Sequence, residues 1–301
     1  QHFSILHVNQ RTNQPTNQPF FSLQQAMKLA PSLSFFLLFF SLTSHQITAQ
    51  TEAEALLKWK NSLSQPDSLT SWTPTTNSPC KWFGIGCDSA GRITQLTLPN
   101  ANLNGTLAEF PFSSLPNLAL LNLSTNLLQG PIPSNLSFAS QLVTLDLSSN
   151  GFAETLPPEI GDLSEVRDLR LYNNNLVGEI PYQLSKLQKV HHLDLGSNSL
   201  ENPDYAKFSP LPSVTYLSLF LNSLTLEFPS FVLNCTNLTY LDLSQNNLTG
   251  SIPELLTNLV NLEYLNLSAN SFQGPVPVFL TKLSKLKDLR LGYNFTGGFL
   301  Q

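Results

Sequence analysis

Most of the chain repeats one spacing of apolar and polar residues, L-x-x-L-x-L-x-x-N-x-L-x-G-x-I-P. The clearest copies begin at Leu118 and Leu238. The first apolar position of each copy gives nine starts, with equal steps from Leu118 onwards: Ile93, Leu118, Leu142, Val166, Val190, Val214, Leu238, Leu262 and Leu286. Self-similarity at a fixed period of this size is typical of a solenoid in which each copy forms one coil.

Each position of the copy predicts a local structure. The L-x-L segment has the period of two of a β-strand, so its leucines point inward and its other residues outward. One coil cannot bury this apolar side alone, and coils therefore stack around a shared core. The later Gly and Pro exclude a long helix and suit a second short extended segment. The predicted fold is an α/β-type repeat solenoid, a curved superhelix with short parallel strands on its concave face.

The asparagine of the copy comes where the chain must turn away from the strand, and its amide can bond backbone groups there. Stacking predicts an interior ladder, with Ala101 in its place in the first coil: Asn126, Asn150, Asn174, Asn198, Asn222, Asn246, Asn270 and Asn294. The copy that begins at Val190 lacks the Gly-x-Ile-Pro segment at residues 201–209. This difference is either sequence drift or a loop that redirects the flank.

Composition excludes some partners. The formal net charge is −5 and only 12% of residues are charged, so nothing favours nucleic acid or an anionic membrane surface. Kinase and G-x-S-x-G motifs are absent from the sequence, and Gly84-Ile-Gly86 lacks the third glycine of a dinucleotide-binding loop. His191, His192 and Asp194 lie close together in the sequence and could suggest a metal or acid–base site. The two histidines are consecutive on one short segment, however, and the sequence offers no further ligand, so we expect a solvated surface there. We therefore expect a binding protein without enzymatic activity, cofactor or metal.

The beginning of the sequence is typical of secretion. Residues 1–26 contain no Met and are rich in Gln, Asn and Pro, so we expect an unstructured leader from an extended gene model. Residues 27–49 have the charged start, apolar run and small residue Ala49 of a cleaved signal peptide. The apolar run is too short for the roughly 20 residues of a membrane-spanning helix. As given, the chain is expected outside the cell.

The repeat at 93–294 resembles the plant-specific class of leucine-rich repeat, and residues 50–92 resemble the N-terminal cap of that class. In this cap an amphipathic helix would cover the first coil with its apolar side chains, which are Leu56, Leu57, Trp59 and Leu63. Cys80 and Cys87 would form a disulfide, since the compartment is expected to be oxidising. The third cysteine, Cys235, is expected to be a buried small apolar side chain.

This arrangement is similar to the extracellular part of plant leucine-rich-repeat receptor-like kinases, and especially to the male-discoverer-interacting receptor kinase group. The resemblance implies perception of an extracellular peptide or protein, or pairing with a leucine-rich-repeat co-receptor kinase. In that family a membrane helix and a cytoplasmic Ser/Thr kinase follow. Here the repeats occupy 93–301 with an incomplete last copy, and the second cysteine pair of the family is missing. We expect an apoplastic protein as given, or a plasma-membrane one if the gene continues.

The outward positions of the strands form columns on the predicted concave face, which is the usual binding surface of solenoids. The third residues of the copies form one column: Gln95, Leu120, Thr144, Asp168, His192, Tyr216, Tyr240, Tyr264 and Asp288. With the neighbouring columns, the candidate ligand-binding residues are Arg170, Tyr172, His192, Asp194, Tyr216, Phe220, Tyr240, Asp242 and Tyr264. The alternative is a structural role, because aromatic residues also stabilise sheets by cross-strand stacking.

Sugar acceptor motifs N-x-S/T are frequent, and several are expected to carry glycan in a secreted protein. They begin at Asn104, Asn122, Asn135, Asn234, Asn237, Asn247, Asn266 and Asn294. Two other functions stay open beside that of a receptor ectodomain. One is a soluble inhibitor of a secreted wall-degrading enzyme, resembling the polygalacturonase-inhibiting proteins, and the other is a structural wall protein.

Overall fold

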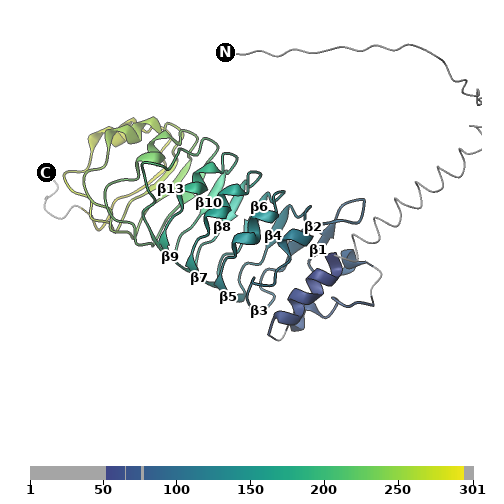
Figure 1. The fold of residues 1–301 in the computed structure, drawn as a ribbon. Coiled ribbons are helices and arrows are strands. Elements are labelled where there is room, and N and C mark those ends of the chain that lie inside the picture. Colours follow the sequence, from purple (N-terminus) through teal and green to yellow (C-terminus); the bar gives the residue numbers. More distant parts are fainter. Residues whose placement is uncertain (1–51, 65, 76–77, 295–301) are drawn as a thin grey trace, which may run out of the picture. The chain divides into compact units, whose positions relative to one another are not determined.

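The computed structural model describes residues 52–64, 66–75 and 78–294 (Figure 1). The expected leader and signal peptide lie outside the described residues. None of the helices within those ranges is long and apolar enough to span a bilayer.

The N-terminal cap begins with a helix that includes residues 52–62. Leu56 and Trp59 on this helix are fully buried, and the Trp59 indole N–H donates to the Thr106 carbonyl at 3.0 Å. Trp59 also packs on Trp72, with ring centroids 6.2 Å apart, and Trp72 stacks on Trp82 at 5.4 Å. The helix thus covers the first coil with apolar side chains, as its pattern predicts.

Short elements complete the cap: the 3-10 helices η1 (Asp67–Leu69) and η2 (Pro79–Lys81) and the strand β1 (Ile85–Cys87). A disulfide joins Cys80 to Cys87, with their Cα atoms 5.6 Å apart. It ties η2 to β1, which pairs antiparallel with the first strand of the repeats. The predicted pairing is therefore confirmed, and Cys235 is free and buried, also as expected.

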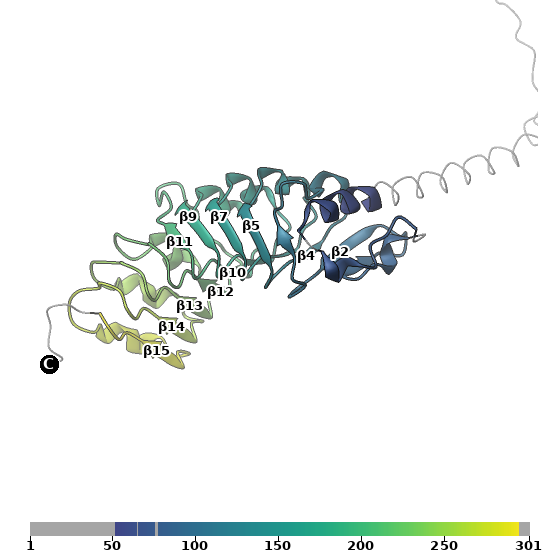
Figure 2. The ribbon, with the colours of Figure 1, turned by 90° about the horizontal axis from the view of Figure 1, so that it is seen from below.

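The nine copies form nine parallel strands of a ten-stranded sheet, called here the larger sheet, with β1 at its edge (Figures 1 and 2). The strands are β2 (Ile93–Thr97), β4 (Leu120–Asn122), β6 (Thr144–Asp146), β8 (Asp168–Arg170), β10 (His192–Asp194), β12 (Tyr216–Ser218), β13 (Tyr240–Asp242), β14 (Tyr264–Asn266) and β15 (Asp288–Arg290). Equivalent positions of neighbouring copies lie opposite one another, for example His192 beside Tyr216 and Tyr216 beside Tyr240. The columns expected from the sequence therefore exist.

A second, smaller sheet forms where the coils carry the Leu-x-Gly-x-Ile-Pro segment or its equivalent. Its strands are β3 (Asn104–Gly105), β5 (Leu127–Pro131), β7 (Gly151–Thr155), β9 (Asn175–Glu179) and β11 (Ser199–Glu201). The sheet ends at β11, in the copy whose pattern breaks. From Asn202 to Asn294 the described chain forms no further strand of this sheet, although the copies that begin at Leu238 and Leu262 keep a Gly-x-Ile-Pro or Gly-x-Val-Pro segment.

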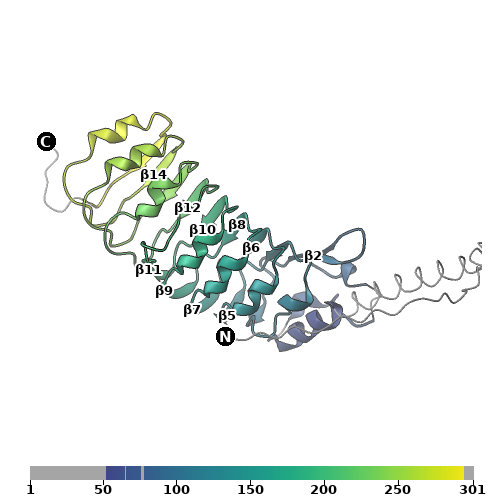
Figure 3. The same ribbon diagram turned by 45° about the horizontal axis from the view of Figure 1, so that its top comes forward.

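Short 3-10 helices run along the side of the coils opposite the larger sheet (Figure 3). They are η3 (Phe112–Ser114), η4 (Ser134–Phe138), η5 (Pro158–Asp162), η6 (Tyr182–Lys186), η7 (Ser230–Asn234), η8 (Glu254–Asn258) and η9 (Val278–Lys282). A proline precedes each of the seven, and each buries at least one apolar side chain. Proline prevents the helix from extending towards its N-terminus, which explains the expected absence of a long helix here.

The asparagine ladder crosses the interior between the two sides. Asn246 is typical: its Nδ2 donates to the carbonyls of Leu219 and Leu243 at 2.9 and 3.1 Å. Its Oδ1 accepts the backbone N–H of Leu224, in the preceding coil, at 3.1 Å. Each asparagine thus joins two coils through backbone groups that would otherwise be buried without partners. The predicted ladder is confirmed.

Candidate functional site

Four aromatic rings stack on the outer face of the larger sheet and are called here the aromatic ladder: His192, Tyr216, Tyr240 and Tyr264. Successive ring centroids are 4.0, 4.2 and 4.2 Å apart, with planes within 8° of parallel. These distances are shorter than the usual strand spacing of about 4.8 Å, so the rings lean together. Because their faces cover one another, the ladder offers ring edges and phenolic hydroxyls to a ligand.

Charged groups close both ends of the aromatic ladder. The Arg290 guanidinium lies over the Tyr264 ring, 5.2 Å from its centroid, and Asp288 holds it through two hydrogen bonds of 3.1 and 2.9 Å. At the other end, Asp168 lies beside His192 in the sheet. A cation over a tyrosine face is attracted by the π electrons, which favours the stacked arrangement.

The ladder side chains are half-buried, and burial shifts the pKa of His192, Tyr216 and Tyr240. Burial raises the pKa of Tyr216, which nearby Asp194 raises further, and burial also raises the pKa of Tyr240. Burial lowers the pKa of His192, although the carboxylates of Asp168, Asp194 and Asp146 act in the opposite direction and the Arg170 cation adds to the effect. Tyr216 and Tyr240 therefore stay neutral hydroxyl donors at ordinary pH.

Two residues after the ladder column, each strand carries a further outward residue, and the charged candidates Arg170, Asp194 and Asp242 lie there. They differ in how far they are exposed and in whether other residues already bind them. Asp168 binds the Arg170 guanidinium through two hydrogen bonds of 2.9 Å. Asp242 is only 7% exposed and is held by the Ser244 hydroxyl at 2.6 Å and by the Asn266 amide at 3.1 Å. Asp242 therefore belongs to the internal network of the sheet, whereas Arg170 reaches the surface.

Asp194 differs from the other carboxylates of this column. It is partly exposed, and its Oδ1 accepts the Gly196 backbone N–H at 3.0 Å. Burial raises its pKa, while hydrogen bonds from Gly196 and the Ser218 hydroxyl lower it. Beside it lie two aromatic candidates, Tyr172, which is 37% exposed, and Phe220, which is partly exposed.

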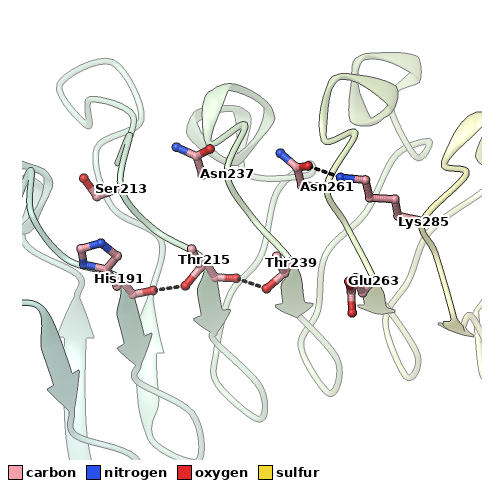
Figure 4. A pocket seen from close by; sticks show the side chains of 8 residues that line it. All are labelled: His191, Ser213, Thr215, Asn237, Thr239, Asn261, Glu263 and Lys285. Carbon is pink, nitrogen blue, oxygen red and sulfur yellow. Dashed lines mark hydrogen bonds between the residues drawn. The ribbon is translucent and has the colours of Figure 1, made fainter.

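A polar hollow of about 430 Å³ opens next to the aromatic ladder, where the chain enters the strands (Figure 4). It is lined by His191, Ser213, Thr215, Asn237, Thr239, Asn261, Glu263 and Lys285. Many of these groups bond to one another: Thr215 donates to the His191 carbonyl at 3.1 Å, Thr239 to the Thr215 carbonyl at 3.0 Å. Sequence reasoning did not single out this hollow, because its lining comes from columns of mixed, unremarkable polar residues.

The structure separates the sugar acceptor motifs. Asn234, Asn237 and Asn247 are exposed. Asn266 is 7% exposed and its amide nitrogen binds Asp242 and the Ser244 hydroxyl. Asn294 is a member of the asparagine ladder, with its nitrogen donating to two backbone carbonyls at 2.7 and 3.1 Å. A sugar on either of the last two would replace one of the two N–H hydrogens that make these bonds, inside the coils and not at an exposed position.

Comparison with known proteins agrees with the fold. Residues 49–88 match the leucine rich repeat N-terminal domain, residues 236–277 match leucine rich repeats in two copies, and residues 141–163 and 165–187 match single leucine rich repeats. The chain is therefore a leucine-rich-repeat protein with an N-terminal cap.

Its curated relatives are plant receptor-like kinases. A probable leucine-rich repeat receptor-like protein kinase of Arabidopsis thaliana is 46% identical over 107 residues, which is 33% of this chain and 10% of that protein. MDIS1-interacting receptor like kinase 2, from the same plant, is 48% identical over 86 residues, 27% of this chain and 8% of that protein. The matches thus span about a tenth of the length of these relatives.

Solved ectodomains resemble the chain over most of its length. The GASSHO1/SCHENGEN3 ectodomain of Arabidopsis, in complex with CASPARIAN STRIP INTEGRITY FACTOR 2, is 36% identical with a TM-score of 0.76, covering 81% of this chain and 30% of that one. The Arabidopsis HAESA ectodomain, in complex with an IDA peptide hormone, is 30% identical with a TM-score of 0.74, covering 82% and 42%. The fold is that of the leucine-rich-repeat ectodomains of plant receptor kinases.

Proposed function

We propose that the chain is the extracellular ligand-binding module of a plant receptor-like kinase, and that it binds an extracellular peptide on the larger sheet across β10 to β14. The observation that carries this proposal is the aromatic ladder. Its stacked rings form a rigid surface with apolar edges and neutral hydroxyls, which suits contacts with a peptide backbone and side chains. Ectodomains of the same fold have been solved with peptide ligands.

A co-receptor kinase is a second partner that we propose, since the HAESA ectodomain has been solved with both its peptide hormone and the co-receptor SERK1. We also infer that the protein is secreted through the signal peptide at 27–49 and reaches the apoplast or the plasma membrane. Exposed Asn234, Asn237 and Asn247 are the sites at which we place glycan. Glycopeptide mapping of the protein secreted by plant cells would find sugar there and none on Asn266 or Asn294; sugar on Asn266 in folded protein would contradict the assignment.

Peptide selection tests the binding proposal. The secreted chain would be immobilised and used to select from a random peptide library, and the affinities of the enriched peptides would be measured. We expect Tyr240→Ala to weaken their binding by about 30-fold, the loss of roughly 2 kcal/mol that marks an interface hot spot. Tyr182→Ala is the control, because Tyr182 is an exposed tyrosine that lies on η6 and not on the larger sheet.

The melting temperature of each variant would show whether it is folded. Enriched peptides that bind wild type, Tyr240→Ala and Tyr182→Ala equally would place the binding surface elsewhere. Failure to enrich any peptide from a folded, monodisperse protein would count against a peptide ligand. Binding to a secreted wall-degrading enzyme instead would favour the inhibitor function.

A further inference from the structure

One outward column of the larger sheet, two residues beyond the Asp194 column, carries serine in four coils. Its members are Ser124, Ser148, Tyr172, Gly196, Phe220, Ser244, Ser268 and Gly292. Each serine hydroxyl donates to the carboxylate or amide oxygen two residues earlier, at 2.6 to 2.8 Å. In these four coils the side-chain oxygen at the Asp194 position is therefore hydrogen-bonded by the serine of the same coil.

The β10 coil departs from this pattern. Gly196 replaces the serine, so Asp194 receives only the backbone N–H from its own coil. No ion pair involves Asp194 in the part of the chain that the structure describes, since Arg170 is bound by Asp168 instead. Asp194 is also more exposed than Asp146, which is 7% exposed. It is a partly buried carboxylate that accepts a hydrogen bond from the Ser218 hydroxyl of the next coil, and Arg170 lowers its pKa without forming an ion pair with it.

The coils on either side of Gly196 carry aromatic residues at the same position. The backbone carbonyl of Gly196 accepts from Asn173, which follows Tyr172, at 2.9 Å, and the carbonyl of Phe220 accepts from Ser197 at 2.6 Å. Two strand spacings place these flanking backbones about 10 Å apart, with no side chain on the glycine between them. The position between Tyr172 and Phe220 therefore carries no side chain and lies next to Asp194, since a Cβ on Gly196 would be 3.1 Å from the Asp194 Oδ1; this position is called here the notch.

We propose that this notch binds the guanidinium group of an arginine side chain from an extracellular peptide. A planar cation midway between two aromatic side chains would be within the roughly 6 Å at which cation–π attraction acts. Arginine also matches a carboxylate in shape and charge and is weakly hydrated for a cation. Asp146, Asp168 and Asp194 surround the single cation Arg170 in this region, so the local charge is complementary to a positive ligand. The inference rests on the proposed peptide-binding function and names one residue type that the ligand carries.

Filling the notch is the sharpest test. Gly196→Ser restores the residue of the neighbouring coils, and its hydroxyl would take the position on Asp194 that the ligand needs. An added Cβ would lie 3.1 Å from Asp194 Oδ1 and from Ser218 Oγ, so a small adjustment is required, which the coils that carry serine make. Gly292→Ser is the matched control: Gly292 occupies the same column next to Arg290 and has open space around it.

The probes are N-acetyl-arginine amide and its uncharged isostere N-acetyl-citrulline amide, with binding to the whole secreted chain followed by ligand-observed NMR. We expect wild type and Gly292→Ser to bind the arginine probe and to prefer it over citrulline. Gly196→Ser and Asp194→Asn should bind it at least about tenfold more weakly, because a charge-assisted pair is lost. Melting curves would confirm that all variants are folded.

Two results would overturn the inference: no binding of the arginine probe to wild type, or equal binding to Gly196→Ser. If library peptides still bind through Tyr240 in that case, the proposed function stands and only the notch is wrong. If the arginine probe depends on Gly196 but no peptide is selected, the notch stands and the peptide proposal fails.

Discussion

Asn174→Ala should destabilise the fold more than the loss of one polar side chain usually does, because this asparagine belongs to the ladder that joins neighbouring coils. Asn174 is 7% exposed. Its Oδ1 accepts the Phe152 N–H at 3.1 Å, and its Nδ2 donates to the carbonyls of Leu147 and Leu171 at 3.1 and 3.0 Å. Alanine removes these three bonds at once, together with a longer one of 3.4 Å from Nδ2 to the Tyr172 carbonyl.

The cost can be worked out group by group. The Phe152 N–H loses its acceptor and becomes a buried orphan, at about 1–3 kcal/mol. The Leu147 and Leu171 carbonyls each keep a bond from the adjacent ladder members, Asn150 at 3.1 Å and Asn198 at 3.0 Å. Each of these two carbonyls therefore loses only the net free energy of one hydrogen bond, about 0.5–1.5 kcal/mol, and not the larger cost of a buried group without a partner. We expect a total decrease of about 3 kcal/mol in the free energy of unfolding.

Urea unfolding followed by far-UV circular dichroism measures this change through the midpoint and slope of the transition. Asn175→Ala is the control: the same substitution one residue later, at an exposed position, with an expected effect within about 0.5 kcal/mol. If the two variants unfold at the same urea concentration, the asparagine ladder does not hold the coils together.

Three further predictions concern the cap and the sheet. Gly84→Ala should cost at least about 2 kcal/mol, since φ is +78° and the new Cβ would lie 2.4 Å from a leucine side chain, whereas Gly91→Ala, with the same φ and open space, should cost about 1 kcal/mol in the same urea assay. Reducing the Cys80–Cys87 disulfide should lower the stability of the cap by about 2 kcal/mol, read from tryptophan fluorescence because all three tryptophans lie there. Burial places the pKa of His192 in the folded state below its unfolded value of about 6.5, so the stability associated with neutral His192 is fully present above that pH and is lost as the pH falls. His192→Tyr should therefore lose less stability than wild type between pH 7.5 and 5.5. Equal losses would contradict a lowered pKa of His192 in the folded state.

The repeat made most of the fold predictable. Its fixed period placed the strands of the larger sheet and the asparagine ladder, because each depends on residues within one coil and its neighbours. The pattern excluded a long helix on the other side of the coils but did not predict the short 3-10 helices found there. Trp59 and Leu56 could be assigned to the cap interface from the amphipathic pattern of a segment that resembles the N-terminal cap of the family. Cys80 and Cys87 pair as the resemblance implied.

The availability of the candidate site residues was less predictable. Asp194 and Asp242 occupy equivalent positions in the sequence pattern, yet Asp242 is bonded by Ser244 and Asn266, whereas Asp194 has Gly196 in place of the serine and is bonded by Ser218 of the next coil. The difference comes from residues on the same and adjacent coils, so no single copy reveals it. The smaller sheet ends at β11, in the copy that departs from the pattern, and this departure did not indicate which structure would follow.

Hydrogen exchange of the secreted chain, with and without a selected peptide, tests the central claim most directly. The claim is that the aromatic ladder and the strands that carry it form the ligand-binding surface. The account predicts that the peptide slows exchange in β10, β12, β13 and β14 and leaves the 3-10 helices η4 to η9 unchanged. Protection confined to the 3-10 helices or to the smaller sheet would contradict it.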